Sequence, residues 1–237
     1  MRFDLLTLFP DMFDAFLSTS IPGRAAACSA AEYMVHDLRR WADNPSRKVD
    51  DRPFGGGPGM VLMCQPVHDA VIAIEQEDSR PATRVLLTPQ GERLDRERVQ
   101  WFSQQERLLL ISGHYEGIDE RVIEELDPLQ VSVGDYVLSS GETASMVLID
   151  AITRLLKGVL GHEQSAEEDS FRLDEQTGQL LLDCPHYTRP REWKGREVPE
   201  VLLSGDHQSI ARWRLEQGRK RTQQRRPDLT NQRPLGE

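Results

Sequence analysis

Three glycine-bearing segments have the composition of a ligand-binding edge. Each follows a run of apolar or β-branched residues: Pro89-Gln90-Gly91, Ser112-Gly113-His114-Tyr115-Glu116-Gly117 and Gly134-Asp135-Tyr136. Glycine lets the backbone approach a ligand closely, so that main-chain N–H and C=O groups can bind it. If the three preceding runs are parallel strands, their exits meet at one edge of a sheet. We expect a small ligand to bind there.

The third segment belongs to the most informative stretch of the chain, residues 131–142. A β-branched run breaks at Gly134, and a long apolar helix pattern opens soon afterwards. Ser139 and Glu142 fit the Ser-x-x-Glu pattern of a capping box, in which the serine caps a helix and the glutamate reaches back to it. We therefore predict a helix that begins beside the expected ligand site.

Strand and helix patterns alternate along the first two-thirds of the chain. The last three strand patterns are continuous apolar runs, typical of strands that are buried on both faces of a parallel sheet. The sequence therefore predicts an α/β fold with a parallel sheet. We expect strands at 3–9, 32–37, 85–88, 108–111 and 130–133, and helices at 11–17, at 67–74 and from 142 onwards.

Charge divides the chain into parts. Residues 1–170 carry 16 basic and 29 acidic groups, whereas residues 171–237 carry 13 basic and 10 acidic groups, within a net charge of −10. The segment 161–170 between them is polar and acidic. We expect an α/β domain at 1–160, a flexible linker at 161–170 and a small, mainly helical domain at 171–237.

A basic helix pattern lies near the end of the chain. This density of positive charge suits contacts with the phosphates of a nucleic acid, but a solvated helix face would show the same composition. Both interpretations stay open on composition alone. Glu216 is the one acidic residue among the basic residues Arg212, Arg214, Arg219, Lys220, Arg221, Arg225 and Arg226.

Several other chemistries are disfavoured. The loop Gly55-Gly56-Gly57-Pro58-Gly59 is not followed by Gly-Lys-Ser/Thr, so it is no nucleotide P-loop, and no Gly-x-Gly-x-x-Gly follows the first strand. The six histidines show no metal-ligand spacing, and we expect Cys28, Cys64 and Cys184 to be buried thiols. No apolar run reaches bilayer length and no secretion signal begins the chain, so we expect a cytoplasmic protein that does not bind membranes.

Four longer motifs, taken in order, resemble the bacterial tRNA (guanine-N1)-methyltransferase family, TrmD, of the SPOUT superfamily. They are Lys48–Asp51 with Gly55–Met60, Gly113–Asp119, Val133–Leu138 and Asp183–Pro190, so the resemblance covers nearly the whole chain. It implies S-adenosylmethionine-dependent methylation of N1 of guanosine at tRNA position 37, beside the anticodon and after a guanosine. It also implies a SPOUT-type parallel sheet with a carboxyl-side trefoil knot, tRNA as a partner that the helical domain at 171–237 binds, and a homodimer with its active site at the subunit interface.

The resemblance gives roles to the glycine-bearing segments. The sulfonium of S-adenosylmethionine already carries an electrophilic methyl group, so the protein has mainly to orient it and to exclude water. Magnesium is also implicated in the family. The residues implied to contact S-adenosylmethionine, largely through backbone atoms, are Leu87, Pro89, Gly113, Tyr115, Glu116, Val133, Gly134, Asp135, Tyr136, Val137, Leu138 and Gly141.

Guanine N1 must lose a proton before it can accept a methyl group. The resemblance implies that Asp169 is the general base and that Arg154 stabilises the negative charge on O6. From the residues alone, Asp169 lies in an acidic run of the linker, and Arg154 follows Asp150 at an ordinary ion-pair spacing. We expect the linker to become ordered over the bound cofactor and to carry Asp169 into the site of the opposite subunit.

Three residues depart from the usual pattern of the family. Ser140 stands where a glycine is common, which bears on the approach of the backbone to the cofactor. Ala144 and Lys157 stand where prolines are common, which bears on the helix near Arg154. Two other functions stay open: a non-catalytic RNA-binding protein with a degenerate pocket, and a SPOUT enzyme that methylates ribose or a different base.

Overall fold

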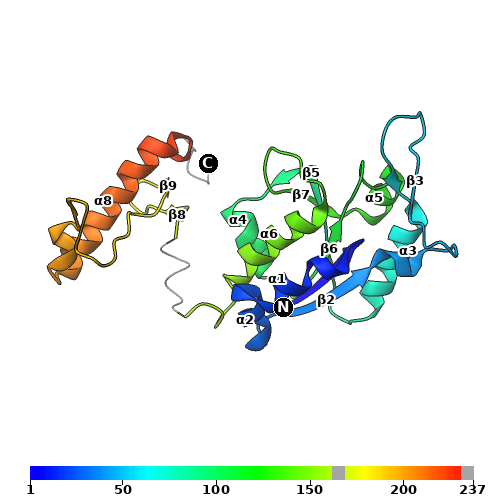
Figure 1. The fold of residues 1–237 in the computed structure, drawn as a ribbon, viewed down its shortest axis with the longest axis horizontal. Coiled ribbons are helices and arrows are strands. Elements are labelled where there is room, and N and C mark those ends of the chain that lie inside the picture. The colour runs from blue at the N-terminus through cyan, green and yellow to red at the C-terminus, as the bar shows by residue number, and fades with distance from the viewer. Residues whose placement is uncertain (162–168, 231–237) are drawn as a thin grey trace. The chain divides into compact units, whose positions relative to one another are not determined.

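The computed structural model describes residues 1–161 and 169–230 of the chain (Figure 1). The chain divides into two compact units, Met1–Gly161 and His162–Glu237. The expected linker at 161–170 falls largely on residues 162–168, which lie outside the described residues. Residues 231–237 at the end of the expected helical domain lie outside them as well.

A five-stranded parallel sheet forms the centre of the first unit, with the strand order β2-β1-β6-β5-β7. The five predicted strands and their parallel arrangement are confirmed, with at most small differences at the ends of four strands and a much longer β5. The strands are β1 Arg2–Thr7, β2 Glu32–Asp37, β5 Thr83–Arg93, β6 Arg107–Ser112 and β7 Leu129–Ser132.

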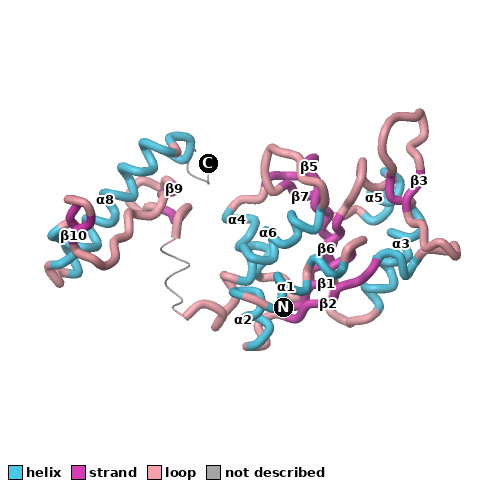
Figure 2. Tube along the Cα trace, in the orientation of Figure 1, coloured by secondary structure: helices cyan, strands magenta, loops and turns pink. Residues whose placement is uncertain are grey.

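Helices cover both faces of this sheet (Figure 2). Successive strand residues point to opposite faces, so Leu108 and Leu110 of β6 lie in one buried cluster and Leu109 and Ile111 in the other. The first cluster includes side chains from α1, α2, α4 and α6, and the second includes side chains from α3 and α5. Burial on both faces explains the continuous apolar runs of the sequence. These helices are α1 Asp14–Ser18, α2 Ser20–Ala27, α3 Cys64–Gln76, α4 Arg96–Ser103, α5 Glu120–Leu126 and α6 Gly141–Thr153.

Strand β5 continues beyond its predicted end. It pairs with β7 in two steps, because Leu87 and Glu92 both lie opposite Val131 and the residues between them loop out. The backbone of Gly91 packs so closely on β7 that a Cβ there would lie 2.3 Å from the nitrogen of Val131. The expected strand exit at residues 89–91 is therefore an excursion within a longer strand, and its prediction as a strand end was wrong.

The second unit contains one long helix, α8 His207–Arg225. The carboxylate of Asp206 caps it by accepting hydrogen bonds from the backbone N–H groups of Gln208 and Ser209. No helix of the described residues is both long and apolar enough to cross a membrane. The sequence did not predict the short strands of this unit, which are β8 Arg172–Leu173 with β9 Leu180–Leu181 and β10 Glu192–Trp193 with β11 Arg196–Glu197.

Shorter elements complete the described chain. In the first unit, the antiparallel strands β3 and β4 flank the glycine-rich loop at 55–59, in which four glycines have positive φ. Only glycine adopts this conformation at no steric cost, so the glycines shape the loop. The strands are β3 Asp50–Asp51 and β4 Val61–Leu62, and the 3₁₀ helices are Pro10–Met12, Leu38–Trp41, Glu200–Leu203 and Pro227–Thr230.

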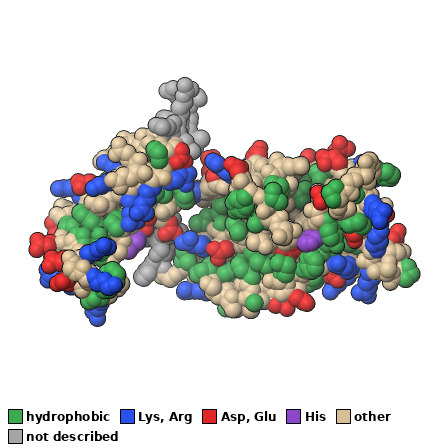
Figure 3. All heavy atoms as spheres, turned by 45° about the horizontal axis from the view of Figure 1, so that its top comes forward, with side chains coloured by type: hydrophobic (Ala, Val, Ile, Leu, Met, Phe, Trp, Pro, Cys, Tyr) green, Lys and Arg blue, Asp and Glu red, His purple; other side chains and the backbone are tan. Residues whose placement is uncertain are grey.

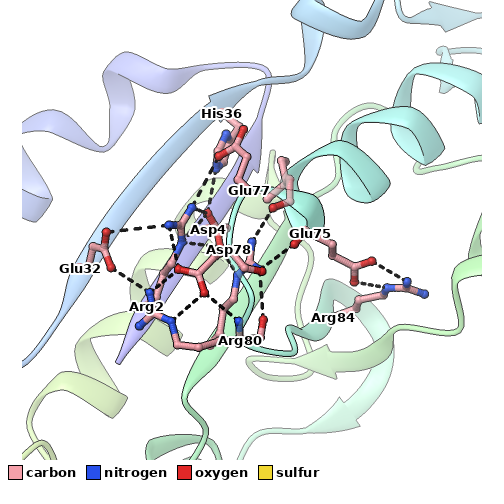
Figure 4. A network of polar contacts seen from close by, with 11 residues as sticks. Arg2, Asp4, Glu32, His36, Glu75, Glu77, Asp78, Arg80 and Arg84 are labelled. Atoms are coloured by element: carbon pink, nitrogen blue, oxygen red, sulfur yellow. Dashed lines mark hydrogen bonds and ion pairs between the residues drawn. The ribbon is translucent and has the colours of Figure 1, made fainter.

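A buried ion cluster joins the amino ends of the central strands (Figure 4). Asp4 of β1 is fully buried and forms hydrogen bonds with Arg2, His36 and Arg107. Burial alone would raise the pKa of Asp4, but these hydrogen bonds outweigh it and lower the pKa to about 2. Arg107 also donates to the carbonyl of Ile74 and so ties β6 to α3.

The cysteines differ from one another in burial. Cys184 is buried, Cys64 is half-buried, and Cys28 is exposed, with no disulfide among them. The prediction of three buried thiols was therefore wrong for Cys28, which is the C-cap residue directly after the last residue of α2.

Candidate active site

The exits of β6 and β7 share one edge of the sheet with the excursion of β5. Strand β5 lies between β6 and β7, and all three run in the same direction. Leu87 of β5 lies opposite Ser112 on one side and Val131 on the other. The backbone segments that follow these residues therefore lie next to one another at the carboxyl edge, where α/β sheets bind ligands.

The backbones of Gly113 and Gly141 are in direct contact at this edge. The N–H of Gly141 donates a 2.8 Å hydrogen bond to the carbonyl of Gly113, and an antiparallel bridge joins His114 to Ser140 beside it. A Cβ on Gly141 would lie 2.7 Å from the nitrogen of Gly113, so a larger residue does not fit. Helix α6 therefore begins directly against the exit of β6.

The N-cap of α6 is Ser140, so the predicted capping box of Ser139 and Glu142 was wrong. No side chain caps the helix, and the buried carboxylate of Glu142 instead accepts a 2.6 Å hydrogen bond from the hydroxyl of Thr7. The backbone of Ser140 is extended, a conformation open to any residue. Ser140 therefore fits at this position without disturbing the contact between Gly113 and Gly141.

Two polar atoms near this edge have no hydrogen-bond partner among the described residues: Nδ1 of His114 and Oε2 of Glu142. Glu142 is fully buried. The ring of His114 lies against Phe9 and Tyr115, with centroid distances of 5.0 Å and 4.6 Å. A buried polar atom without a partner costs free energy, so such atoms favour a site at which a bound group completes the hydrogen bonding.

The loop after β7 exposes apolar side chains. Val137 is 84 % exposed and Tyr136 is 56 % exposed. The ring of Tyr136 lies over Gly134, where a Cβ would be 2.5 Å from the ring. The positive φ of Gly134 also favours glycine at this position. Large apolar side chains exposed together are typical of a surface that a ligand or a second subunit covers.

The glycine-rich loop also lies against this site. The N–H of Glu116 donates to the carbonyl of Met60, and the side chain of Glu116 packs on Gly59. Tyr115 has a left-handed backbone with a φ of +58°, which is uncommon for a non-glycine residue. Sequence reasoning from the strand exits missed this contact, because nothing in the spacing of residues 55–59 and 113–117 indicates it.

Comparison with known proteins identifies the family. The family model described as tRNA (Guanine-1)-methyltransferase TrmD matches residues 1–232. The chain belongs to the TrmD family. The tRNA (guanine-N(1)-)-methyltransferases of Rhodopirellula baltica and Moorella thermoacetica are 51 % and 50 % identical to it over 97 % of this chain, covering 93 % and 90 % of their own lengths. The enzyme of that name from Chloroflexus aurantiacus is 49 % identical over 97 % of this chain and 88 % of its own.

Neither of the two residues expected to be catalytic belongs to the segments that follow the strands. Arg154 is exposed at the end of α6, whose 13 residues separate it from Gly141 by about 20 Å at 1.5 Å per residue. Asp169 is half-buried and belongs to the second unit. Helix α6 runs unbroken through Ala144, and Lys157 lies beyond its end. Neither departure from the family pattern therefore disturbs the helix that leads to Arg154.

The basic face of α8 is smaller than its composition implies. Arg219 donates two hydrogen bonds to Asp174, and Arg226 pairs with Asp228. Acidic partners from outside the run therefore neutralise part of it, and the 45 positions between Asp174 and Arg219 hid their pairing from the sequence. Figure 3 shows Lys and Arg side chains over the visible face of the second unit. The exposed members of the run are Arg212, Arg214, Lys220 and Arg225.

Within the described residues, two groups bring three potential metal ligands together. One is Asp4, His36 and Glu77 in the buried ion cluster, where two arginines already bind Asp4. The other is Asp183, Cys184 and His186 in the second unit. The first group lies at the amino ends of the strands and not at the carboxyl edge, so residues 1–161 bring no group of three such ligands together beside the strand exits.

Proposed function

We propose that this chain transfers a methyl group from S-adenosylmethionine to N1 of guanosine in tRNA, at position 37 after a preceding guanosine. The observation that carries this proposal is the glycine-lined edge around Gly113 and Gly141 in a member of the TrmD family. Relatives named tRNA (guanine-N(1)-)-methyltransferase match the chain over almost its whole length. A tRNA substrate assigns the activity to the cytoplasm.

The residues at the carboxyl edge fit S-adenosylmethionine. The closely packed glycines leave backbone groups accessible to polar atoms of a ligand, and Nδ1 of His114 has no partner among the described residues. The exposed ring of Tyr136 and the side chain of Val137 suit the adenine ring. The cofactor would supply an electrophilic methyl group there. We assign its binding to Leu87, Pro89, Gly113, Tyr115, Glu116, Val133, Gly134, Asp135, Tyr136, Val137, Leu138 and Gly141.

Asp169 and Arg154 act on guanine in this proposal. The Asp169 carboxylate accepts the proton from N1 and so makes that nitrogen nucleophilic. The Arg154 guanidinium stabilises the negative charge that then grows on O6. Family membership supports both assignments, together with a SPOUT fold that has a trefoil knot on the carboxyl side of the first unit.

We also propose a homodimer with its active site at the subunit interface. Arg154 lies about 20 Å along α6 from Gly141, which is farther than an arginine side chain reaches, so Arg154 acts at the site of the partner subunit. Asp169 acts there too. Figure 3 supports a covered surface, since hydrophobic side chains form a band across the visible face of the first unit. Met12 and Val147 are exposed apolar residues of that unit.

Magnesium is not part of this proposal. The ion prefers carboxylate, carbonyl and water oxygens in an octahedral arrangement. Within residues 1–161, the one group of three potential ligands is in the buried ion cluster, where two arginines already bind Asp4. Residues 1–161 therefore hold no preformed group of three ligands for magnesium beside the strand exits.

Mass spectrometry of nucleosides tests the proposed function. The purified chain is incubated with S-adenosylmethionine and a tRNA transcript that carries guanosines at positions 36 and 37, and we expect 1-methylguanosine. A transcript with adenosine at position 37 is the control. A methylated ribose or a different methylated base would replace this proposal with another SPOUT reaction. Binding of tRNA without product and without S-adenosylmethionine binding would indicate an RNA-binding protein.

A further inference from the structure

The hairpin formed by β10 and β11 has two chemically different faces. Glu192 lies opposite Glu197, and Trp193 lies opposite Arg196. Successive residues of a strand point to opposite faces, whereas residues directly opposite each other share a face. Both carboxylates therefore lie on one face, and the indole of Trp193 shares the other face with the guanidinium of Arg196.

A tight turn fixes this arrangement. Lys194 and Gly195 connect the strands and have φ angles of +52° and +72°, as a two-residue type I′ turn requires. The register of a hairpin follows from its turn, so the separation of the two faces is built into the sequence. The Lys194 ammonium lies 4.8 Å from the centre of the Trp193 ring, which adds a second cation beside the indole.

The hairpin and the segment before it are exposed. All residues from 186 to 197 are exposed, and Trp193 is 57 % exposed. None of the ion pairs formed by the described residues includes Arg189, Arg191, Lys194 or Arg196. An exposed aromatic ring among unpaired cations is the composition of surfaces that bind single-stranded nucleic acid.

We propose that the Trp193–Arg196 face of this hairpin docks an unpaired loop of tRNA, with a base stacked on Trp193 and an adjacent phosphate bound by Arg196. The inference rests on the proposed function, which supplies tRNA as the ligand. Bases within a stem stack on one another, whereas loop bases can be splayed out to stack on an aromatic side chain, so the partner is a loop and not a stem. The carboxylates of Glu192 and Glu197 repel phosphates and direct their own face away from the RNA.

Substitution of Trp193 tests the stacking contact. The full-length chain is titrated with an unmodified tRNA transcript, and Trp193→Ala is expected to weaken binding by about 5- to 100-fold, the loss of one base stack. Trp193→Phe keeps a stacking ring and retains most of the affinity. Glu192→Gln, on the acidic face of the same strand, is the matched control and does not weaken binding. Because Trp193 and Glu192 are both exposed, the melting temperatures of all three variants are expected to match that of the wild type.

Substitution of Arg196 and a change of RNA complete the test. Arg196→Gln is expected to reduce the slope of log affinity against log salt by about 1, while Trp193→Ala leaves the slope unchanged. A fully duplex RNA is expected to bind wild type and Trp193→Ala equally. Equal affinity of wild type and Trp193→Ala for tRNA would overturn the inference, even when 1-methylguanosine forms. If the wild type makes no 1-methylguanosine but Trp193→Ala still weakens tRNA binding, the proposed function fails and the docking surface stands.

Discussion

The hydroxyl of Thr7 donates a 2.6 Å hydrogen bond to the buried carboxylate of Glu142. The same hydroxyl oxygen accepts the backbone N–H of Phe9, so its own proton is directed at the carboxylate. This bond links the end of β1 to the first turn of α6, next to the contact of Gly113 with Gly141. One hydroxyl therefore supports the start of the helix that borders the proposed cofactor site.

We expect Thr7→Val to destabilise the chain by about 1–3 kcal/mol, because it leaves a buried carboxylate without its hydrogen-bond donor. Unfolding by urea measures the change. Thr7→Ser is the control, since it keeps the hydroxyl and is expected to stay close to the wild type. Identical unfolding of the valine and serine variants would show that the bond contributes nothing.

Gly141→Ala is expected to reduce stability, whereas Gly113→Ala is expected to weaken cofactor binding. A Cβ on Gly141 would meet backbone atoms at 2.7 Å, so we expect that variant to lose stability. A Cβ on Gly113 would meet no heavy atom within 4 Å, so that variant should fold normally. It is expected to bind S-adenosylmethionine about tenfold more weakly, because the new methyl group enters the proposed site. Calorimetric titration decides, and unchanged affinity in Gly113→Ala would place the cofactor elsewhere.

Asp169→Ala is expected to abolish methyl transfer while S-adenosylmethionine binds nearly as in the wild type, because the proposed general base is not among the residues assigned to the cofactor. Turnover on tRNA and calorimetric titration measure the two effects. Wild-type turnover in this variant would remove Asp169 from its proposed role.

Mixed dimers test whether the active site is shared. Subunits that carry Asp169→Ala are mixed with subunits that carry a substitution abolishing cofactor binding. If Asp169 acts on the partner's site, each mixed dimer holds one intact site, and about a quarter of the wild-type activity returns on random mixing. If Asp169 acts within its own subunit, no activity returns.

The stability of the first unit is expected to fall as the pH drops from about 4 to about 2. The folded pKa of Asp4, about 2, lies below its ordinary value of 3.8, so Asp4 adds stability above pH 4 that is lost as it becomes protonated. This shift corresponds to about 2 kcal/mol. Asp4→Asn should remove this part of the pH dependence and cost about 3–5 kcal/mol at neutral pH, because it leaves buried arginines without their carboxylate. Urea unfolding across this range, with the exposed Asp11→Asn as the control, provides the measurement.

Arg219→Gln and Lys220→Gln are expected to separate stability from tRNA binding on α8. Arg219 binds the buried carboxylate of Asp174 and lowers its pKa to about 2, so its loss should reduce the melting temperature. Lys220 is exposed, so its loss should lower the salt slope of tRNA binding by about 1 and leave the melting temperature unchanged. A change in melting temperature for Lys220→Gln and none for Arg219→Gln would contradict this division.

Local sequence patterns predicted the strands of the sheet better than they predicted the contacts between residues far apart in the chain. The strands of the first unit could be predicted because burial on both faces requires unbroken apolar runs, and the glycines marked where two of the strands end. The capping box was wrong because Glu142 bonds to Thr7, which lies 135 positions away and leaves no local signal. The excursion of β5 escaped prediction for the same reason, since its course depends on the close approach of Gly91 to Val131.

The proposed cofactor site was predictable in part. Glycine-bearing exits predicted a shared edge, and the parallel order of β6, β5 and β7 accounts for it. The resemblance alone supplied Asp169 and Arg154, because a carboxylate in an acidic run and an arginine at ion-pair spacing look like ordinary surface residues. Their proposed roles depend on the proposed homodimer, which no pattern along one chain encodes.

The strand order also sets the time at which the first unit can fold during synthesis. Strand β1 lies in the interior of the sheet, and its neighbour β6 follows about a hundred residues later in the chain. At about 5–20 residues per second, a ribosome releases β6 some seconds after β1. Until then the apolar faces of β1 and β2 have no complete sheet to join. The nascent chain is therefore expected to need protection from aggregation until β7 emerges, and no shorter amino-terminal fragment should fold alone.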